Sequence, residues 1–452
     1  MLRLDFGKAI QEKERAFAHI PRTAPTLTEL LGQIIMKLSD FKHAIARFFG
    51  KCKREDTMPN IQDYVIWRGD LPLDRVPLCD VDALLLSYLS YMPYDNIVGD
   101  AFDGGISLRE AAQKLLEVNE REKTPLAYNV KEDRKLLAAL MESARFGDIQ
   151  LVGYINRVDT KLEEQFSAVT YLLGEGHAFV AFRGTDNTVV GWKEDFNMSF
   201  ETEVPAQRDA VAYAQRVAAA IDLPLIVGGH SKGGNLAAYA GMFVDEATRA
   251  RIQTVYNFDG PGFNEATISS EAFGKVDMRI RTFVPQSSMI GILMWHREPF
   301  TIVRSNGVGV FQHDAYTWQI LGGGFMTLTE RTGHSHFADD TIKRWLEELS
   351  PDMRRQAIDG IYAVLSASGG MNVSELFEAR NTMSVLKAAG AMDEKTKSAV
   401  LEAFRLLGSS MIGGVPAWLE RTASTVAQKM PWEQRREEAK AHAEQQPPEL
   451  AK

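Results

Sequence analysis

The feature that most constrains the fold is a short apolar run that passes directly into a helical pattern. Residues 223–230, LPLIVGGH, are apolar enough for a buried strand, and residues 235–247, NLAAYAGMFVDEA, have the spacing of a helix. Further strand-like runs follow at 254–260, 279–285 and 300–305, and helical or loop stretches separate them. Alternation of this kind favours a mostly parallel sheet with helices on both faces.

Two more strand-like runs precede this region, at 165–173 and 177–185, and a Gly-Glu-Gly segment separates them. This arrangement predicts a β-hairpin. Upstream, the segment DVDALLLSYLSYMPYD at 80–95 is apolar enough to predict a buried helix.

The start of the chain contains an amphipathic helical pattern. Between residues 26 and 49 apolar side chains recur at spacings of three and four, and the basic residues Lys51, Lys53 and Arg54 follow. Basic residues beside an apolar stripe suit an anionic membrane surface. We therefore expect the segment 26–54 either to make peripheral membrane contact or, as is more usual for such stripes, to pack on its own domain.

The remaining patterns divide the chain into four parts. Residues 1–60 are predicted to form an N-terminal helical extension, and residues 61–340 an α/β domain. Residues 341–431 have helical patterns, and residues 432–452 are polar, charged and contain proline, which predicts a disordered tail.

Composition excludes several classes of protein. The net charge of −9 over 452 residues argues against a nucleic-acid partner. Two cysteines form no disulfide framework, and charges stand where a signal peptide would have its apolar run, so we expect a cytoplasmic protein. The longest apolar stretches, such as 289–295, fall far short of the ~20 residues that span a bilayer.

The segment Gly229-His230-Ser231-Lys232-Gly233 fits the pattern G-x-S-x-G between the predicted strand and helix. In α/β-hydrolases a serine at such a turn projects its hydroxyl from the sheet edge, and small neighbours make the sharp turn possible. The sequence thus predicts an α/β-hydrolase fold with Ser231 as nucleophile. The alternative is an ordinary Gly-rich loop that binds phosphate, although the chain has no Walker lysine-serine pair here.

With these motifs the chain resembles the fungal-type, class-three triacylglycerol lipases. The resemblance rests on FRGT at 182–185, followed by Trp192 and Asp195, and on GHSKGGNLA at 229–237 for the family's GHSLGGALA. The nearest resemblance is to a related bacterial family of α/β-hydrolase-like proteins marked by five motifs. These motifs are YVIWRGDL, LSYLSYMPYD, GHSKGGNLA, NFDGPGF and QHDAYTW, all present here within residues 61–330.

The resemblance to lipases implies the two donors of an oxyanion hole. Thr185, the residue after the glycine of FRGT, takes the position of the first donor, and the backbone N–H of Lys232 takes that of the second. The alternative is that Thr185 only ends a strand, with Asp186 and Asn187 forming the turn that follows.

A serine nucleophile needs a histidine base, and in this fold the base follows the nucleophile in the chain. His313 lies in QHDAY, which resembles the D-H-x-x-Y arrangement around the catalytic histidine of fungal lipases. His334 and His336, in GHSHF, remain alternatives. His230 is expected to be structural, because such a turn points it away from the nucleophile. The histidines that follow the nucleophile are His296, His313, His334, His336 and His442.

The sequence indicates the acid of the triad less clearly than the base. Fungal lipases place an aspartate shortly before a Val-Pro pair, but the matching stretch 282–287, TFVPQS, has no carboxylate. Asp259 ends the preceding predicted strand, where some other α/β-hydrolases have their acid. It equally suits the turn that Gly260-Pro261-Gly262 would form. Asp314 and Glu298 are further candidates.

The sequence therefore predicts a serine hydrolase that cleaves an ester-type acyl bond without a metal or cofactor. Ser231, His313 and Asp259 would form its triad, and Thr185 and Lys232 its oxyanion hole. Lipids, thioesters, small esters and peptides all suit this constellation. The missing acid at the lipase position motivates a second hypothesis, a weakly active or inactive hydrolase scaffold that binds a partner through its helical extensions.

Overall fold

The computed structural model describes residues 58–366, apart from short gaps, and residues 391–400. Residues 58–354 lie in one compact unit, and residues 355–366 and 391–400 in a second. The predicted amphipathic segment 26–54, most of the predicted region 341–431 and the predicted tail lie outside the described residues. The gaps are residues 124, 128, 160, 162–163, 175, 187–188, 199–200, 202, 308, 334, 337–338, 341–342 and 344–347.

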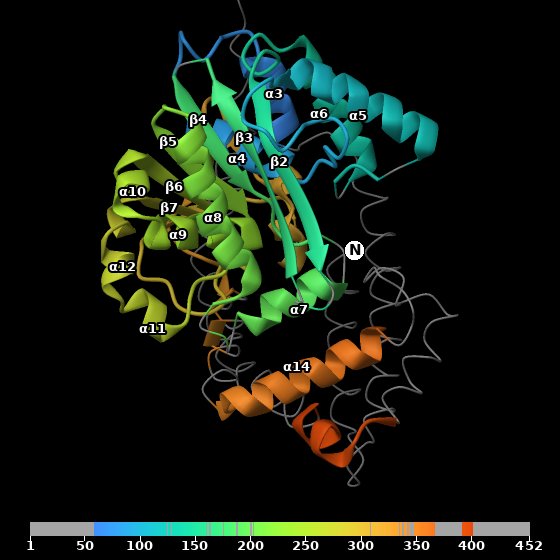
Figure 1. The fold of residues 1–452 in the computed structure, drawn as a ribbon, viewed down its shortest axis with the longest axis vertical. Helices are drawn as coiled ribbons and strands as arrows, with labels where there is room; N and C mark the ends of the chain where they lie inside the picture. The colour runs from blue at the N-terminus through green and yellow to red at the C-terminus, as the bar shows by residue number, and fades with distance from the viewer. Residues whose placement is uncertain are drawn as a thin grey trace, which may run out of the picture. The chain divides into compact units, whose positions relative to one another are not determined.

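A nine-stranded sheet organises the larger unit (Figure 1). Its five central strands, β4 to β8, are parallel, and β1 to β3 and β11 add to the two sides in antiparallel pairs. The predicted hairpin is the antiparallel pair β3–β4. In sheet order the strands are β1 (Ile106–Ser107), β2 (Gln150–Asp159), β3 (Glu164–Leu173), β4 (His177–Phe182), β5 (Leu225–His230), β6 (Ile252–Phe258), β7 (Ile280–Pro285), β8 (Phe300–Val303) and β11 (Thr327–Leu328); β9 (Ile320–Leu321) and β10 (Gly324–Phe325) form a separate pair.

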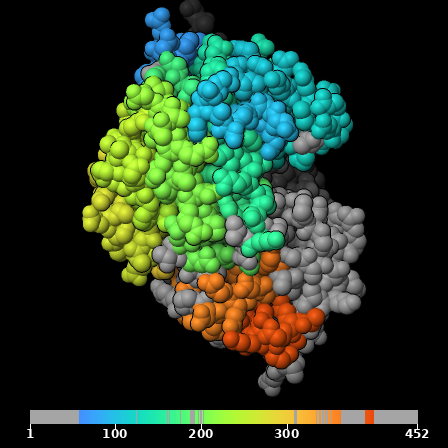
Figure 2. Space-filling view, viewed as in Figure 1, coloured from blue at the N-terminus to red at the C-terminus, as the bar shows by residue number. Residues whose placement is uncertain are grey.

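Helices cover both faces of this sheet (Figure 1). Figure 2 shows one side of the molecule, where α8 and α10 to α12, in green to yellow, form part of the surface. The helices of this unit are α3 (Ile61–Arg68), α4 (Asp80–Leu89), α5 (Leu108–Glu122), α6 (Val130–Glu142), α7 (Val189–Asn197), α8 (Pro205–Ala220), α9 (Lys232–Phe243), α10 (Glu246–Arg251), α11 (Glu265–Ile268) and α12 (Glu271–Gly274), with the 3₁₀ turns η2 (Asp277–Arg279), η3 (Gly309–His313) and η4 (Ala315–Thr317).

Alternate residues of β4 and β5 enter two different cores. In β4, Phe179 and Ala181 join the core that contains α4, whereas Ala178, Val180 and Phe182 join the core that contains α8 and α9. This period of two is the geometry of a strand with both faces covered. The predicted α/β-hydrolase fold, with helices on both faces of a central parallel sheet, is confirmed.

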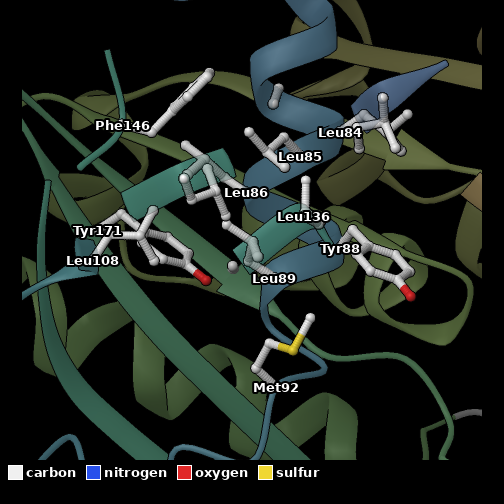
Figure 3. Packing of buried hydrophobic residues seen from close by; sticks show 14 of the residues in the cluster. Leu84, Leu85, Leu86, Tyr88, Leu89, Met92, Leu108, Leu136, Phe146 and Tyr171 are labelled. Carbon is white, nitrogen blue, oxygen red and sulfur yellow. The ribbon is translucent and has the colours of Figure 1, made fainter. Parts of the chain in front are cut away.

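The helix α4 is mostly apolar, and all of its residues after Asp80 are buried. Figure 3 shows its leucines Leu85, Leu86 and Leu89 beside Leu136 of α6 and Tyr171 of β3. The helix ends at Leu89, earlier than the predicted range 80–95, because the chain bends before Pro93.

One polar contact of α4 is as deeply buried as its leucines. Arg145 donates to Asp82 at 2.5 Å, and both side chains have 0% exposure. Arg145 also donates to the carbonyl oxygens of Leu71, Val76 and Pro77. Because every charge has a partner, this ion pair is tolerated in the core.

The second unit contains most of α14 (Pro351–Ser366), which covers part of the helical pattern predicted after residue 340. Gly360 lets this helix approach residues 391–400 closely, because a Cβ atom here would lie 2.5 Å from the Thr396 side chain. Within residues 58–366 and 391–400, no helix combines the length and apolar content needed to cross a bilayer.

Candidate active site

Ser231 lies at the turn between β5 and α9, as the G-x-S-x-G pattern predicts. Its backbone has φ 61° and ψ −136°, a conformation that is costly for a residue with a side chain and that marks functional sites. The Ser231 N–H donates to the Phe258 carbonyl at 2.9 Å, which ties the turn to β6. The turn therefore has the strained backbone of a nucleophile elbow.

Glycine is required on both sides of this elbow. A Cβ atom on Gly229 would lie 2.2 Å from the Gly233 carbonyl carbon, and one on Gly233 would lie 2.1 Å from the Phe182 carbonyl oxygen. The end of β5, the start of α9 and the end of β4 thus meet at distances that exclude any side chain.

His313 and Asp259 lie together, although 54 residues separate them. The His313 Nδ1 atom is 2.7 Å from Asp259 Oδ2, and Asp259 is 1% exposed at the end of β6. The second oxygen, Oδ1, accepts hydrogen bonds from the Ser288 hydroxyl at 2.5 Å and the Gly291 N–H at 3.1 Å. These contacts hold one carboxylate oxygen and leave the other for the histidine, as a triad acid requires.

The other candidate acids have other partners. Glu298 accepts from the Thr282 hydroxyl at 2.8 Å and is 2.9 Å from His296 Nδ1. Asp314 accepts from the Tyr316 N–H at the start of η4, and burial raises the pKa of its carboxyl group. The structure therefore joins the predicted base to Asp259.

Of the two alternative bases, His336 lies in a helical segment in which its N–H donates to the Thr332 carbonyl at 3.2 Å. His334 lies outside the described residues, as does His442.

His230 supports the backbone beside the base. Its Nε2 atom is 2.8 Å from the His313 carbonyl oxygen, and its Nδ1 atom is 3.2 Å from the Tyr91 hydroxyl. The two imidazole rings lie 4.5 Å apart. Burial, together with the nearby His313, holds the pKa of His230 well below its usual range, so this ring is neutral and structural. His230, the residue before Ser231, thus connects the turn directly to the segment that contains His313.

The FRGT segment lies against the elbow. A Cβ atom on Gly184 would lie 2.6 Å from the His230 carbonyl oxygen and 2.9 Å from the Ser231 Cβ atom. The next residue, Thr185, donates its hydroxyl to Asp195 Oδ2 at 2.5 Å. Burial raises the pKa of Asp195 to about 6, while the Lys232 charge and the Thr185 hydrogen bond oppose this rise.

The second predicted oxyanion donor is the backbone N–H of Lys232, the first residue of α9. Among the described residues this N–H has no acceptor, as is usual in the first turn of a helix. Likewise, within the described chain, neither the Ser231 hydroxyl nor the His313 Nε2 atom forms a hydrogen bond. Such contacts commonly tighten only when a substrate binds.

Sequence reasoning missed the residues that surround these groups. Ser288 and Gly291 follow β7 with no local pattern that marks them as partners of Asp259. Tyr91 lies in LSYLSYMPYD, a motif that sequence analysis noted without assigning it a role. Across the described residues, no three His, Cys, Asp or Glu side chains are grouped to hold a metal ion.

Comparison with known proteins gives both a family and a set of similar structures. No curated protein sequence matches the chain. Among solved structures, M37 lipase is 14% identical, with 46% of this chain and 68% of that chain covered and a TM-score of 0.30. Lipase II from Rhizopus niveus is 12% identical, with 59% and 86% covered and a TM-score of 0.31. Lip2 lipase from Yarrowia lipolytica is 10% identical, with 42% and 74% covered and a TM-score of 0.26. The family model that matches is described as Mbeg1-like and spans residues 140–363. Over these residues, just under half of its length, the chain is similar to the Mbeg1-like family.

Proposed function

We propose that the chain is a serine hydrolase that cleaves an ester-type acyl bond. The observation that carries this proposal is the 2.7 Å contact between His313 and Asp259 beside a strained serine elbow. A buried carboxylate on Nδ1 fixes the tautomer in which Nε2 can accept a proton. A histidine and a serine held in one cluster in this way are the ingredients of nucleophilic acyl transfer.

In this mechanism the Ser231 oxygen attacks the acyl carbonyl carbon while its proton moves to His313 Nε2. Asp259 stabilises the resulting imidazolium, and the backbone N–H of Lys232 together with Thr185 stabilises the oxyanion. When the carbonyl re-forms, the bond to the alcohol breaks and His313 returns the proton to the departing oxygen. Water then attacks the acyl-enzyme by the same route, which releases the acid and regenerates Ser231.

The alternative hypothesis, a weakly active or inactive hydrolase scaffold, was motivated by the missing carboxylate in the stretch 282–287. Asp259 weighs against it, because this carboxylate reaches His313 from the end of the preceding strand.

The substrate class in this proposal is a small-molecule or lipid ester, and the setting is the cytoplasm. The substrate class rests on the residues of the site, and the cytoplasmic setting rests on the composition of the chain. Peripheral membrane contact through residues 26–54 concerns a segment outside the described residues.

The direct test of the function is hydrolysis of a p-nitrophenyl ester by the purified chain and by Ser231→Ala. We expect the wild-type protein to turn over and the variant to lose at least about 10³-fold in kcat, since triad residues act as a unit. The melting temperature should not fall, because alanine keeps the helix start. Equal turnover by a folded Ser231→Ala protein would place the activity elsewhere.

A further inference from the structure

Beside the proposed oxyanion hole lies a buried polar cluster of Gln165, Glu194 and Lys232. The Lys232 and Glu194 side chains have 0% exposure, and their charged atoms are 2.8 Å apart. Gln165 at the start of β3 is 1% exposed. None of the three side chains has a role in the acyl-transfer steps above, although Lys232 directly follows the proposed nucleophile.

All three donors of the Lys232 ammonium group have a partner in this cluster. Nζ donates to the Gln165 carbonyl oxygen at 2.8 Å, to Gln165 Oε1 at 3.3 Å and to Glu194 Oε2 at 2.8 Å. Glu194 in turn accepts from the N–H groups of Gln165, at 3.1 Å, and of Ala206, at 3.0 Å. The side chain of the first residue of α9 is therefore anchored to β3, α7 and the start of α8.

The same cluster also reaches the other proposed oxyanion donor. Gln165 Oε1 accepts from the Asp186 N–H at 3.3 Å, and Asp186 directly follows Thr185. Glu194 directly precedes Asp195, which accepts the Thr185 hydroxyl. One amide oxygen thus links the segment of Thr185 to the side chain of Lys232.

Stability alone does not account for this arrangement. Burying two charges costs desolvation free energy, and apolar replacements of buried ion pairs are often as stable. An oxyanion hole, by contrast, needs donors that are fixed before the reaction and aimed at one point. We propose that Gln165, Glu194 and the Lys232 side chain are positioning residues that set the spacing of the two oxyanion donors; this inference rests on the proposed function.

The test removes the hydrogen bonds of the Lys232 side chain and keeps the backbone N–H of residue 232, which is the proposed oxyanion donor. Lys232→Met retains the backbone N–H of residue 232 but loses all three Nζ hydrogen bonds, and Glu194→Gln removes the charge while keeping an acceptor. We expect kcat for a p-nitrophenyl ester to fall about 10- to 100-fold in each folded variant, less than the loss of a whole donor, with KM changed by less than about threefold. The rate of labelling by a fluorophosphonate should fall with kcat.

The matched control is Asp82→Asn, which neutralises the other buried ion pair, Asp82–Arg145. This variant should lower the melting temperature as Glu194→Gln does, yet keep kcat within about twofold once folded. If Lys232→Met proves too unstable, Lys232→Met/Glu194→Gln removes both charges and serves instead.

The outcomes separate this inference from the function on which it rests. An active wild-type protein whose folded Lys232→Met and Glu194→Gln variants keep wild-type kcat would overturn the positioning role alone. A folded wild-type protein with neither turnover nor labelling would overturn the proposed function, and the inference with it.

Discussion

The two oxygens of Asp259 have different partners, and this division decides what the residue can do. Oδ1 is held by Ser288 and Gly291, so Oδ2 stays in place for His313 Nδ1. The chain offers a natural comparison in Glu298, which forms a similar buried pair with His296.

Asp259→Asn should lower kcat by at least about 10², because the amide keeps the side chain's size but removes the charge that stabilises the imidazolium. Glu298→Gln is the control, since it removes the same charge from the other histidine pair. Its kcat should stay within about threefold of wild type. Comparable losses in both variants, measured with the melting temperature of the same preparations, would show that Asp259 acts only through stability.

At this scale chain order and local motifs led to His313 and Asp259 as members of one triad. The structure places their side chains 2.7 Å apart, and their catalytic roles stay a prediction. The sequence did not predict Ser288, Gln165 or Glu194. These residues reach the site from a loop, a strand end and a helix, and their meeting depends on the whole sheet, which no spacing along the chain encodes.

Three elements converge at the elbow: the ends of β4 and β5 and the start of α9. Gly184 is the point where the segment after β4 meets the turn, since a Cβ atom there would lie 2.6 Å from the His230 carbonyl oxygen and 2.0 Å from the Tyr91 hydroxyl. The catalytic geometry proposed here therefore depends on the spacing between neighbouring strand ends.

Gly184→Ala should displace the FRGT segment and lower kcat about 10-fold or more, because small displacements in an active site have large effects on rate. Gly174→Ala is the control, since nothing lies within 4 Å of a Cβ atom in that turn. Measurement of kcat and of melting temperature for both variants checks this expectation. An unaltered kcat in Gly184→Ala would show that the close approach is not needed.

Most central elements were predictable from sequence, and the others were not for identifiable reasons. Strands β4 to β8 are short apolar runs separated by helical or loop stretches. Strand β2 was not predicted, because its second half is largely exposed and a bulge between Val152 and Ile155 interrupts the alternation. The helices α5 and α6 cover this side of the sheet. They were not predicted, because their sequences mix polar and apolar residues.

At the scale of the whole molecule, buried carboxyl groups make stability depend on pH. Burial, and then contact with Asp209, raises the pKa of Glu164 to about 7. In the unfolded chain the pKa of a glutamate is about 4.3. The folded state therefore binds more protons than the unfolded state between these values, so this group's stabilising contribution is present below about pH 4.3 and is lost as pH rises through 7.

Glu164→Gln should accordingly raise the melting temperature at pH 8, where the wild-type carboxylate is ionised, and have little effect at pH 5. The exposed Glu110→Gln is the control, because surface ion pairs contribute little at either pH. Thermal unfolding of the three proteins at both pH values checks the sign. A variant that is less stable than wild type at pH 8 would contradict it.

The central claim is that Ser231 is an activated nucleophile, and covalent labelling tests it most directly. The folded wild-type chain is incubated with a fluorophosphonate, and the modified residue is located by mass spectrometry, with Ser231→Ala and His313→Ala treated in parallel. We predict modification at Ser231, none in Ser231→Ala, and strongly slowed modification in His313→Ala, because the serine needs its base. An unmodified wild-type protein, or equal labelling of the Ser231→Ala protein, would contradict the account.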